Sequence, residues 1–281
     1  MPIAYPDVLE LKTDEARYAW SDQQAMLYSL GVGLGSDPLD ERELPFVFEN
    51  GLKGFPTFCT VIASPLPLLA KAGVNFALVV HGEQAIELHQ PFPPEGEATG
   101  VIAVTGVYDK GPKGAVLILT TALKDAKGAP LATLKHAIFA RGDGGFGGPA
   151  DGEEPPHQIP DRAPDQSLDI PTRPDQALLY RLSGDRNPLH ADPGFAKAVG
   201  FPRPILHGLC TYGVTCRAVM AAYTGMDPTP VRSHQARFSA PLFPGETVTV
   251  DLWRDGDVVS FVARVKDRDV VVIKNGRTVL G

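Results

Sequence analysis

The densest group of polar side chains lies in the segment Tyr180-Arg-Leu-Ser-Gly-Asp-Arg-Asn-Pro-Leu-His190. Gly184 and the Asn-Pro pair each favour a turn, so this segment should form a bent loop. Such a loop can bring the side chains of Asp185, Asn187 and His190 into one small volume. An acid, an amide and an imidazole can together hold a water molecule and transfer its proton. A neighbouring carboxylate would raise the pKa of the imidazole. The spacing therefore indicates acid–base chemistry on water.

The same residue types are also ordinary loop composition, and Asp185 could simply cap a turn. A second segment favours the chemical interpretation. Pro202-Arg-Pro-Ile-Leu-His-Gly208 ends where a long helix is predicted to begin. Gly208 would then lie at a helix N-terminus, where backbone N–H groups are free and the helix dipole is positive. Such a position can stabilise a developing oxyanion.

The elements that position these residues fall into two series, separated by a region rich in glycine, proline and acidic residues at 142–174. We place domains at 1–145 and 166–281, with a linker at 146–165. Ser21 is predicted to cap a helix ending near Leu30. Other helices are predicted at 175–182 and 207–223, and strands at 76–80, 85–89, 101–107, 116–121, 131–139, 235–239, 247–252, 258–265 and 270–274. The similar order predicts an α+β protein with a duplicated unit.

Two details of the second series give specific expectations. Gly213 lies on the apolar face of the helix predicted at 207–223, where it should let that face approach a sheet closely. In the strand predicted at 247–252, valine and leucine alternate with polar residues. This alternation predicts that Thr247, Thr249 and Asp251 face solvent.

The composition argues against several classes of function. The net charge is −7 and no run of five Lys or Arg occurs, so nucleic acid is not an expected partner. No apolar run is long enough to span a membrane, and the N-terminus lacks a signal-peptide pattern. The 3 cysteines have no C-x-x-C spacing, which argues against a disulfide framework or a zinc site. We therefore expect a cytoplasmic protein.

The motif Ser183-Gly-Asp-Arg-Asn-Pro-Leu-His190 resembles the signature of the (R)-specific enoyl-CoA hydratases, the hydratase 2 or MaoC-like group. The stretch Ile205-Leu-His-Gly-Leu-Cys-Thr-Tyr-Gly213 is similar to a companion segment in the hydratase domain of peroxisomal multifunctional enzyme type 2. Further similar segments follow in the same order along nearly the whole chain, at 27–33, 55–58, 81–84, 109–111, 144–148 and 237–238.

This resemblance implies a double hot-dog fold, in which two fused antiparallel sheets each wrap around a helix. It implies the reversible hydration of trans-2-enoyl-CoA to (3R)-3-hydroxyacyl-CoA by syn addition of water, in fatty acid metabolism such as β-oxidation. No metal or other cofactor is expected, since coenzyme A is part of the substrate. The motif is absent before residue 150, so we expect one site per chain, with the first domain supplying an acyl-chain tunnel. We also expect a homodimer.

The resemblance assigns roles to individual residues. Asp185 and His190 would be the catalytic pair, and Asn187 would help to hold the water. The N–H of Gly208 would donate to the thioester oxygen. The positions that match acyl-CoA contacts are His81, Gly82, Lys110 and Phe238.

Two other functions are weighed, an acyl-CoA thioesterase and a non-catalytic acyl-CoA-binding subunit. The intact set of Asp185, Asn187 and His190 argues against both. The division of acid and base roles within the pair stays open, as does the preferred acyl-chain length. We interpret His207 as a structural residue at a helix start, and 144–148 as a flexible crossover between domains.

Overall fold

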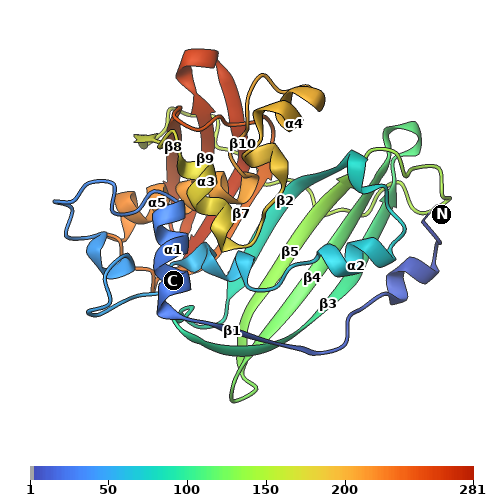
Figure 1. Ribbon diagram of the computed structural model, residues 1–281, viewed down its shortest axis with the longest axis horizontal. Coiled ribbons are helices and arrows are strands. Elements are labelled where there is room, and N and C mark those ends of the chain that lie inside the picture. The colour runs from blue at the N-terminus through green and yellow to red at the C-terminus, as the bar shows by residue number, and fades with distance from the viewer. Residues whose placement is uncertain (1–2) are drawn as a thin grey trace.

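Ten antiparallel strands form one continuous sheet in the order β1-β3-β4-β5-β2-β7-β10-β9-β8-β6 (Figure 1). This computed structural model describes residues 3–281. The strands are β1 Ala16–Trp20, β2 Val79–Leu88, β3 Gly96–Asp109, β4 Ala115–Asp125, β5 Pro130–Ala140, β6 Gln166–Pro171, β7 Val231–Phe238, β8 Thr247–Asp255, β9 Val258–Val265 and β10 Val270–Leu280. The α-helices are α1 Asp22–Gly31, α2 Leu66–Lys71, α3 Gln176–Tyr180, α4 Pro193–Ala198 and α5 Gly208–Tyr223.

The sheet consists of two halves with the same internal order. Counted from its outer edge, the first half runs β1-β3-β4-β5-β2 and the second runs β6-β8-β9-β10-β7. The halves join where β2 pairs with β7, from Glu83 opposite Arg237 to Glu87 opposite Ser233. The expected α+β double hot-dog fold is confirmed, with its two sheets fused edge to edge.

The two halves differ in what covers their inner faces. The long helix α5 lies across the second half, and 10 of its 16 residues are buried. In the first half the corresponding face is covered by the short helix α2 and a 3-10 helix at Pro56–Val61. Helix α1 starts at the predicted cap Ser21. The structure adds a capping box, because the Ser21 hydroxyl accepts from the Gln24 N–H and the Gln24 amide oxygen accepts from the Ser21 N–H.

The buried apolar side chains form two clusters. The larger one is shared by both halves and includes Tyr28, Ile86 and Phe261. The smaller one belongs to the first half and includes Leu68 of α2 and Leu117 of β4. The helices cover these clusters, and none among residues 3–281 is long and apolar enough to cross a membrane.

The structure corrects several predicted elements. The separate strands at 76–80 and 85–89 are wrong: 76–78 form a 3-10 helix and the single strand β2 follows. The polar centre of β2 hid its continuity. The edge strands β1 and β6 were not predicted. Strand β6 lies within the glycine-, proline- and acid-rich region at 142–174 that separates the two predicted series of elements.

Two packing expectations are also wrong. A side chain at Gly213 would meet Val32, at 2.5 Å from its Cγ1, so the close approach is to the end of α1 and not to a sheet. On the polar face of β8, Thr247 is exposed as expected, but Thr249 and Asp251 are buried. Charged and hydroxyl side chains of neighbouring strands cover them, including Arg264, whose Nε donates to the Asp251 carboxylate at 2.6 Å.

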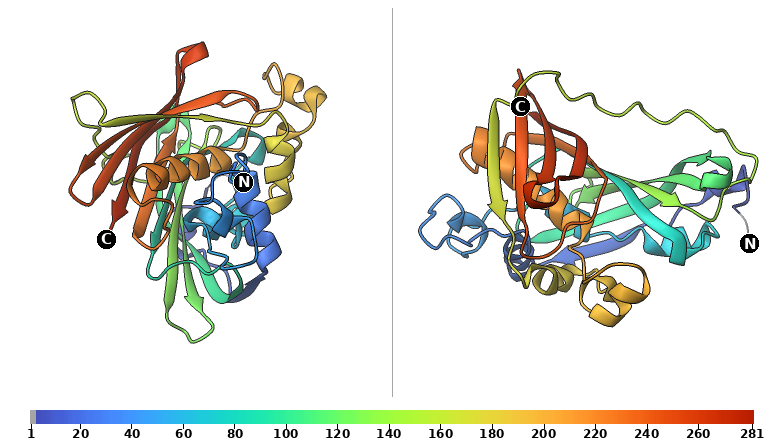
Figure 2. Two further views of the ribbon diagram at one scale, coloured as in Figure 1. Left: turned by 90° about the vertical axis from the view of Figure 1, so that its left-hand side faces the viewer. Right: turned by 90° about the horizontal axis from the view of Figure 1, so that it is seen from above.

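The segment between β5 and β6 crosses the outer face of the sheet as an extended strap (Figure 2). Its glycines are held in place, since the N–H groups of Gly145 and Gly147 donate to the two carboxylate oxygens of Asp109 at 2.7 and 2.8 Å. Both glycines have positive φ angles, which favour glycine. The expected crossover at 144–148 between the halves is confirmed, and these hydrogen bonds give it a defined conformation. The domain division with a linker at 146–165 stays a prediction.

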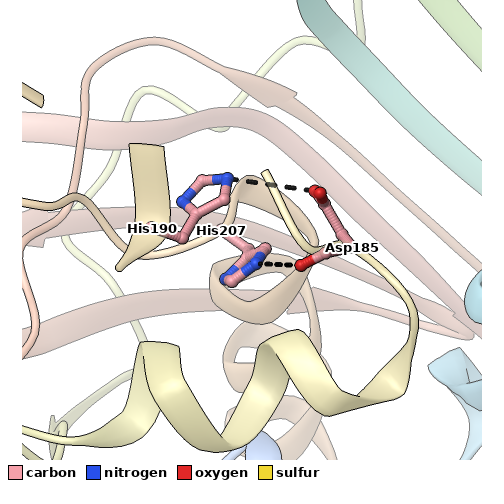
Figure 3. Close-up of side chains that lie close together, drawn as sticks. All are labelled: Asp185, His190 and His207. Carbon is pink, nitrogen blue, oxygen red and sulfur yellow. Dashed lines mark hydrogen bonds and ion pairs between the residues drawn. The ribbon is translucent and has the colours of Figure 1, made fainter. Parts of the chain in front are cut away.

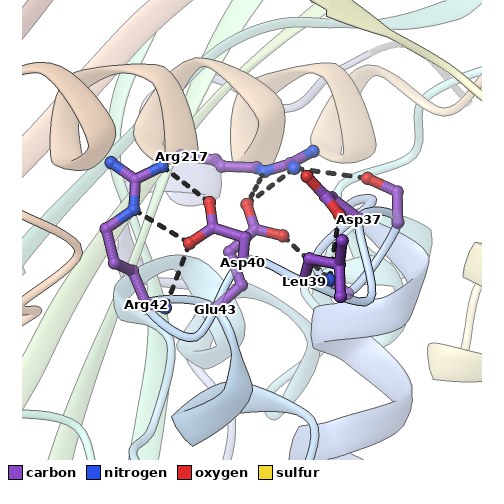
Figure 4. A network of polar contacts seen from close by, with 8 residues as sticks. Asp37, Leu39, Asp40, Arg42, Glu43 and Arg217 are labelled. Atoms are coloured by element: carbon purple, nitrogen blue, oxygen red, sulfur yellow. Dashed lines mark hydrogen bonds and ion pairs between the residues drawn. The ribbon is translucent and has the colours of Figure 1, made fainter.

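A buried ion pair ties α5 to the loop after α1 (Figure 4). Arg217 of α5 contacts Glu43 at 2.6 Å. Glu43 also accepts from the backbone N–H of Gly35 at 2.9 Å. Both charged side chains are largely buried, so this pair fixes the position of α5 relative to the first half.

Candidate active site

The predicted polar loop has a defined shape built from its own side chains. Gly184 ends a 3-10 helix with a φ of 129°, a conformation that favours glycine. One carboxylate oxygen of Asp185, Oδ1, accepts from the Asn187 N–H at 3.0 Å. The Asn187 side-chain oxygen in turn accepts from the Leu189 N–H at 3.0 Å. These local bonds fix Oδ1 and leave Oδ2 of Asp185 as the oxygen that faces His190.

The tautomer of His190 follows from its contacts. Nδ1 lies 2.8 Å from the carbonyl oxygen of Ile205, which can only accept, so Nδ1 carries the proton. In the neutral ring, Nε2 then has the free lone pair. It lies 3.8 Å from Oδ2 of Asp185 (Figure 3). This separation is too long for a direct hydrogen bond, but both atoms can contact one water or substrate oxygen.

The pKa of His190 moves opposite to the expectation from its neighbour. Burial of the ring lowers this pKa and outweighs the hydrogen bond to Ile205 and the charge of Asp185, which both raise it. The ring is therefore neutral near pH 7 and can act as a base. Asp185 itself remains exposed, so it can present a charge to a water molecule.

His207 contributes a second imidazole to this group. Its ring stacks on the His190 ring, with centroids 3.6 Å apart and planes 24° apart. Its Nε2 lies 3.1 Å from the backbone carbonyl oxygen of Asp185, and Figure 3 shows the contact. Its Nδ1 is buried without a partner. Burial lowers the pKa of His207 to about 4, so this ring is also neutral near pH 7.

Potential ligand atoms of Asp185, His190 and His207 lie within 4.8 Å of one another. A metal ion would need their lone pairs to converge on one point. Two nearly parallel stacked rings direct their nitrogen lone pairs side by side, and one nitrogen of each ring already contacts a carbonyl oxygen. The arrangement therefore favours proton transfer over metal coordination.

Gly208 begins α5 directly after His207. The N–H groups of a first helical turn have no acceptor within the helix. A Cβ atom at Gly208 would come within 3.3 Å of the Phe238 ring. The glycine thus lets this aromatic ring lie directly against the helix start, beside a free N–H donor.

The first half contributes His81 to the same region. Its ring centroid lies 5.1 Å from that of Phe238, across the junction of β2 and β7. Gly82 follows at a bulge, since the pairing with β5 shifts between His81 and Glu83. Bulges of this kind redirect neighbouring side chains. Burial lowers the pKa of His81 to about 4, and the charge of Asp185 acts in the opposite direction.

Comparisons with known proteins place the chain in a family. Residues 156–276 match a model described as a MaoC like domain, and residues 18–142 match the MFE-2 hydratase 2 N-terminal domain. The chain is 44% identical to "Enoyl-CoA hydratase ChsH3" of Mycobacterium tuberculosis, over 97% of both chains. It belongs to the MaoC-like hydratase 2 family.

Other members of the MaoC-like hydratase 2 family agree with this result. The chain is 38% identical to "Enoyl-CoA hydratase 2, peroxisomal" of Arabidopsis thaliana, over 95% of this chain and 92% of the relative. A solved structure of a MaoC-like dehydratase from Phytophthora capsici superposes with a TM-score of 0.86 at 34% identity. It covers 98% of this chain and 97% of its own.

One residue assigned to acyl-CoA contact lies apart from the others. Lys110 follows β3, in the turn to β4, and its Nζ contacts the carbonyl oxygen of Ala150 at 2.6 Å and the carboxylate of Glu153 at 2.7 Å. It lines an open surface depression together with Lys113 and Asp151. In this MaoC-like hydratase 2 protein, a role for Lys110 in binding CoA phosphate stays a prediction, and Glu153 would have to be displaced.

His207 is the residue that sequence reasoning undervalued. It occupies the N-cap of α5, where Ser, Thr, Asp or Asn is preferred, and its side chain caps nothing. A histidine at this position beside a glycine was therefore a usable signal for a role other than helix capping. The structure brings it into contact with both members of the expected catalytic pair.

Proposed function

We propose that this protein is an (R)-specific enoyl-CoA hydratase, a hydro-lyase that converts trans-2-enoyl-CoA to (3R)-3-hydroxyacyl-CoA and back. The observation that carries the proposal is the pair of Nε2 of His190 and Oδ2 of Asp185, 3.8 Å apart beside the start of α5. The names of the relatives, including an enoyl-CoA hydratase and a "3-hydroxyacyl-thioester dehydratase Y", support the reaction class. The resemblance of the motif to (R)-specific hydratases supports the configuration.

The proposed reaction uses one water molecule held between Asp185 and His190, with the Asn187 amide available as a further contact. Nε2 of His190 removes a proton from this water while the oxygen attacks C3 of the enoyl thioester. The electron pair of the double bond moves toward the thioester oxygen, which accepts from the N–H of Gly208. Such a donor contributes roughly 3–4 kcal/mol in other enzymes.

The imidazolium then returns the proton to C2 from the same face. One residue thus performs both proton transfers, which gives syn addition, and Asp185 orients the water and stabilises the positive ring. In this scheme His81 and Phe238 line the thioester pocket, with Gly82 shaping the strand between the halves. No metal or other cofactor takes part.

We assign His207 as a positioning residue, because its Nε2–H supports the carbonyl of Asp185 and its ring supports the ring of His190. His207→Phe keeps the stacking and removes the hydrogen bond, so we expect a lower kcat at nearly unchanged KM. His207→Gln retains a donor and should recover part of kcat. Equal activity of both variants and the wild type would contradict this role.

The proposed function is tested by incubating the protein with crotonyl-CoA and with trans-2-decenoyl-CoA. Hydration is measured as the loss of enoyl-thioester absorbance, and the configuration of the product is determined by chiral analysis. We expect (3R)-3-hydroxyacyl-CoA. A (3S) product, or release of CoA without hydration as a thioesterase would give, overturns the proposal. Asp185→Asn and His190→Ala should abolish hydration while the thermal melt still shows a folded protein, and full activity in either would remove that residue from the mechanism.

We further propose that the protein acts in fatty acid metabolism in the cytoplasm as a homodimer. The three cysteines, Cys59, Cys210 and Cys216, are free thiols in the interior, which fits a reducing compartment. Light scattering coupled to size-exclusion chromatography measures the oligomeric state, and a monomeric mass would contradict the dimer.

A further inference from the structure

Three polar side chains lie buried on the inner face of the first half of the sheet. Gln84 of β2 is directly opposite His136 of β5. Thr121 of β4 lies diagonally beside His136, two residues beyond Leu119, which is its direct partner. The exposed fractions of Gln84, Thr121 and His136 are 1%, 0% and 1%. We name these three residues the polar band.

The polar band contains hydrogen-bonding atoms without protein partners. Oε1 of Gln84, Oγ1 of Thr121 and both ring nitrogens of His136 make no hydrogen bond. Buried polar atoms are normally paired, because leaving one unpaired costs stability. The second half shows the usual solution, since the buried His234 bonds Thr278 through Nδ1 at 2.7 Å and a second hydroxyl through Nε2 at 3.1 Å.

The polar band interrupts an otherwise apolar lining. On β5, His136 separates Leu134 of the larger apolar cluster from Ile138 of the smaller one. On β4, Thr121 separates Leu123 from Leu119 in the same way. The covering layer here is the short α2 and a 3-10 helix, without the long helix that fills the second half. The polar band therefore lies on the inner face of the half that is expected to supply the acyl-chain tunnel.

Ring contacts connect the polar band to the candidate active site. The His136 ring lies 5.6 Å from the His81 ring, which lies 5.1 Å from the Phe238 ring. Phe238 in turn lies against Gly208 at the start of α5. The polar band is thus two ring contacts away from the ring that lies against the helix start, where the thioester is proposed to bind.

The chemistry of the polar band selects a neutral group. An amide oxygen accepts, a hydroxyl donates or accepts, and a neutral imidazole does one at each nitrogen. Burial lowers the pKa of His136 to about 3, so the ring carries no charge near pH 7. An anionic group would find no positive charge among these residues, whereas a hydroxyl or carbonyl oxygen would find matched donors and acceptors.

We propose that the polar band is a specificity subsite for a neutral oxygen function, a hydroxyl or keto group, on the acyl part of the substrate. This inference rests on the proposed function, since it names the class of enoyl thioester that the same site prefers. The oxygen satisfies Thr121 and His136 on binding, and a plain hydrocarbon chain leaves them unpaired. A site built for a polar group discriminates strongly against an analogue that lacks it.

The test uses trans-2-enoyl-CoA thioesters of one chain length, which carry a single hydroxyl at successive carbons, together with the unsubstituted thioester. In the wild type we expect one position to raise kcat/KM at least about tenfold over the unsubstituted chain. Thr121→Val preserves the shape and removes the hydroxyl, so this preference should fall about tenfold while activity on the unsubstituted chain rises. Gln84→Leu should act in the same direction.

Thr120→Val is the matched control. Thr120 is the next residue on β4, on the opposite face, where its Oγ1 lies 2.7 Å from that of Thr105. This variant should leave the preference unchanged. A wild type that favours no hydroxyl position, or a preference that survives both Thr121→Val and Gln84→Leu, overturns the subsite. Failure to hydrate any thioester contradicts the proposed function instead, so the two failures are distinguishable.

Discussion

Mild acid should destabilise this protein strongly, because four histidines with strongly lowered pKa values are uncharged in the folded state. Burial lowers the pKa of His81 and His207 to about 4, and that of His136 and His234 to about 3. In the unfolded chain each histidine has its ordinary pKa of about 6.5. The unfolded state therefore binds more protons below that pH, and the free energy of unfolding falls as the pH falls.

The size of this effect follows from linkage. At pH 5.5 an unfolded histidine with a pKa of about 6.5 is roughly nine-tenths protonated, which favours unfolding by about 1.4 kcal/mol per residue when the folded ring stays neutral. The four rings together give about 5 kcal/mol between pH 7.5 and pH 5.5. Glu83, whose pKa burial raises, takes up a proton in the folded state and opposes part of the trend. Such a loss is comparable to the whole stability of many domains.

The assay is urea unfolding at pH 7.5, 6.5 and 5.5, followed by tryptophan fluorescence. His136→Leu removes one of the four titrating rings, so its loss between pH 7.5 and 5.5 should be smaller by about 1.4 kcal/mol. Thr121→Val, on the same inner face, changes no titrating group and should show the full loss. A wild-type loss below about 1.5 kcal/mol would refute the reasoning, because it would mean that these rings are protonated in the folded protein.

The remaining predictions concern the reaction and the contact between the halves. Because burial lowers the pKa of His190, the acid limb of kcat/KM should lie below the ordinary histidine pKa of about 6.5; an acid limb above pH 7 in the pH–rate profile would contradict a neutral base. Gly208→Ala places a methyl group 3.3 Å from the Phe238 ring. Alanine is the better helix former and keeps the N–H, but its methyl group would occupy the space beside this N–H where the thioester is proposed to lie. We expect an unchanged melting temperature with kcat/KM at least about tenfold lower; an unchanged kcat/KM would argue against a thioester bound against this helix start. Arg217→Met leaves Glu43 buried without its partner and should cost about 3–5 kcal/mol in urea unfolding. Glu43→Gln added to it should recover part of this loss, and a cost below about 1 kcal/mol would show that solvent reaches the pair.

Local signals predicted much of the fold. The capping residue Ser21 marked the start of α1, and the apolar strand at 258–265 has the bounds of β9. The strands that were not predicted, β1 and β6, lie at the two edges of the sheet and are short. Each edge strand is stabilised by backbone hydrogen bonds to one strand that is distant in sequence: among the described residues, β1 pairs with β3 and β6 pairs with β8. No local pattern encodes such a partner.

In the candidate site, too, residues close in sequence were predictable, and residues brought together by distant strand pairing were not. The loop with Asp185 and His190 was predictable because its residues are close in sequence. The position of His81 was not, because it depends on a β2–β7 pairing between residues far apart in the chain, and only the family resemblance pointed to it. Asp185 raises the pKa of His190 as its position in the sequence predicts, but burial lowers this pKa by more. A neighbouring charge can be inferred from the sequence, whereas the burial of the ring depends on the fold.

Because the two halves are fused in one chain, dilution of the protein does not separate the parts of the candidate active site. The site takes His81 from one half and Asp185 from the other, so in separate half-size subunits its assembly would depend on concentration. Here the strap after β5 joins the halves, and closing it costs an entropy that grows only slowly with its length. The effective concentration of one half near the other is fixed by the chain. A composite site of this kind persists at any protein concentration, and each half is free to diverge from the other in sequence.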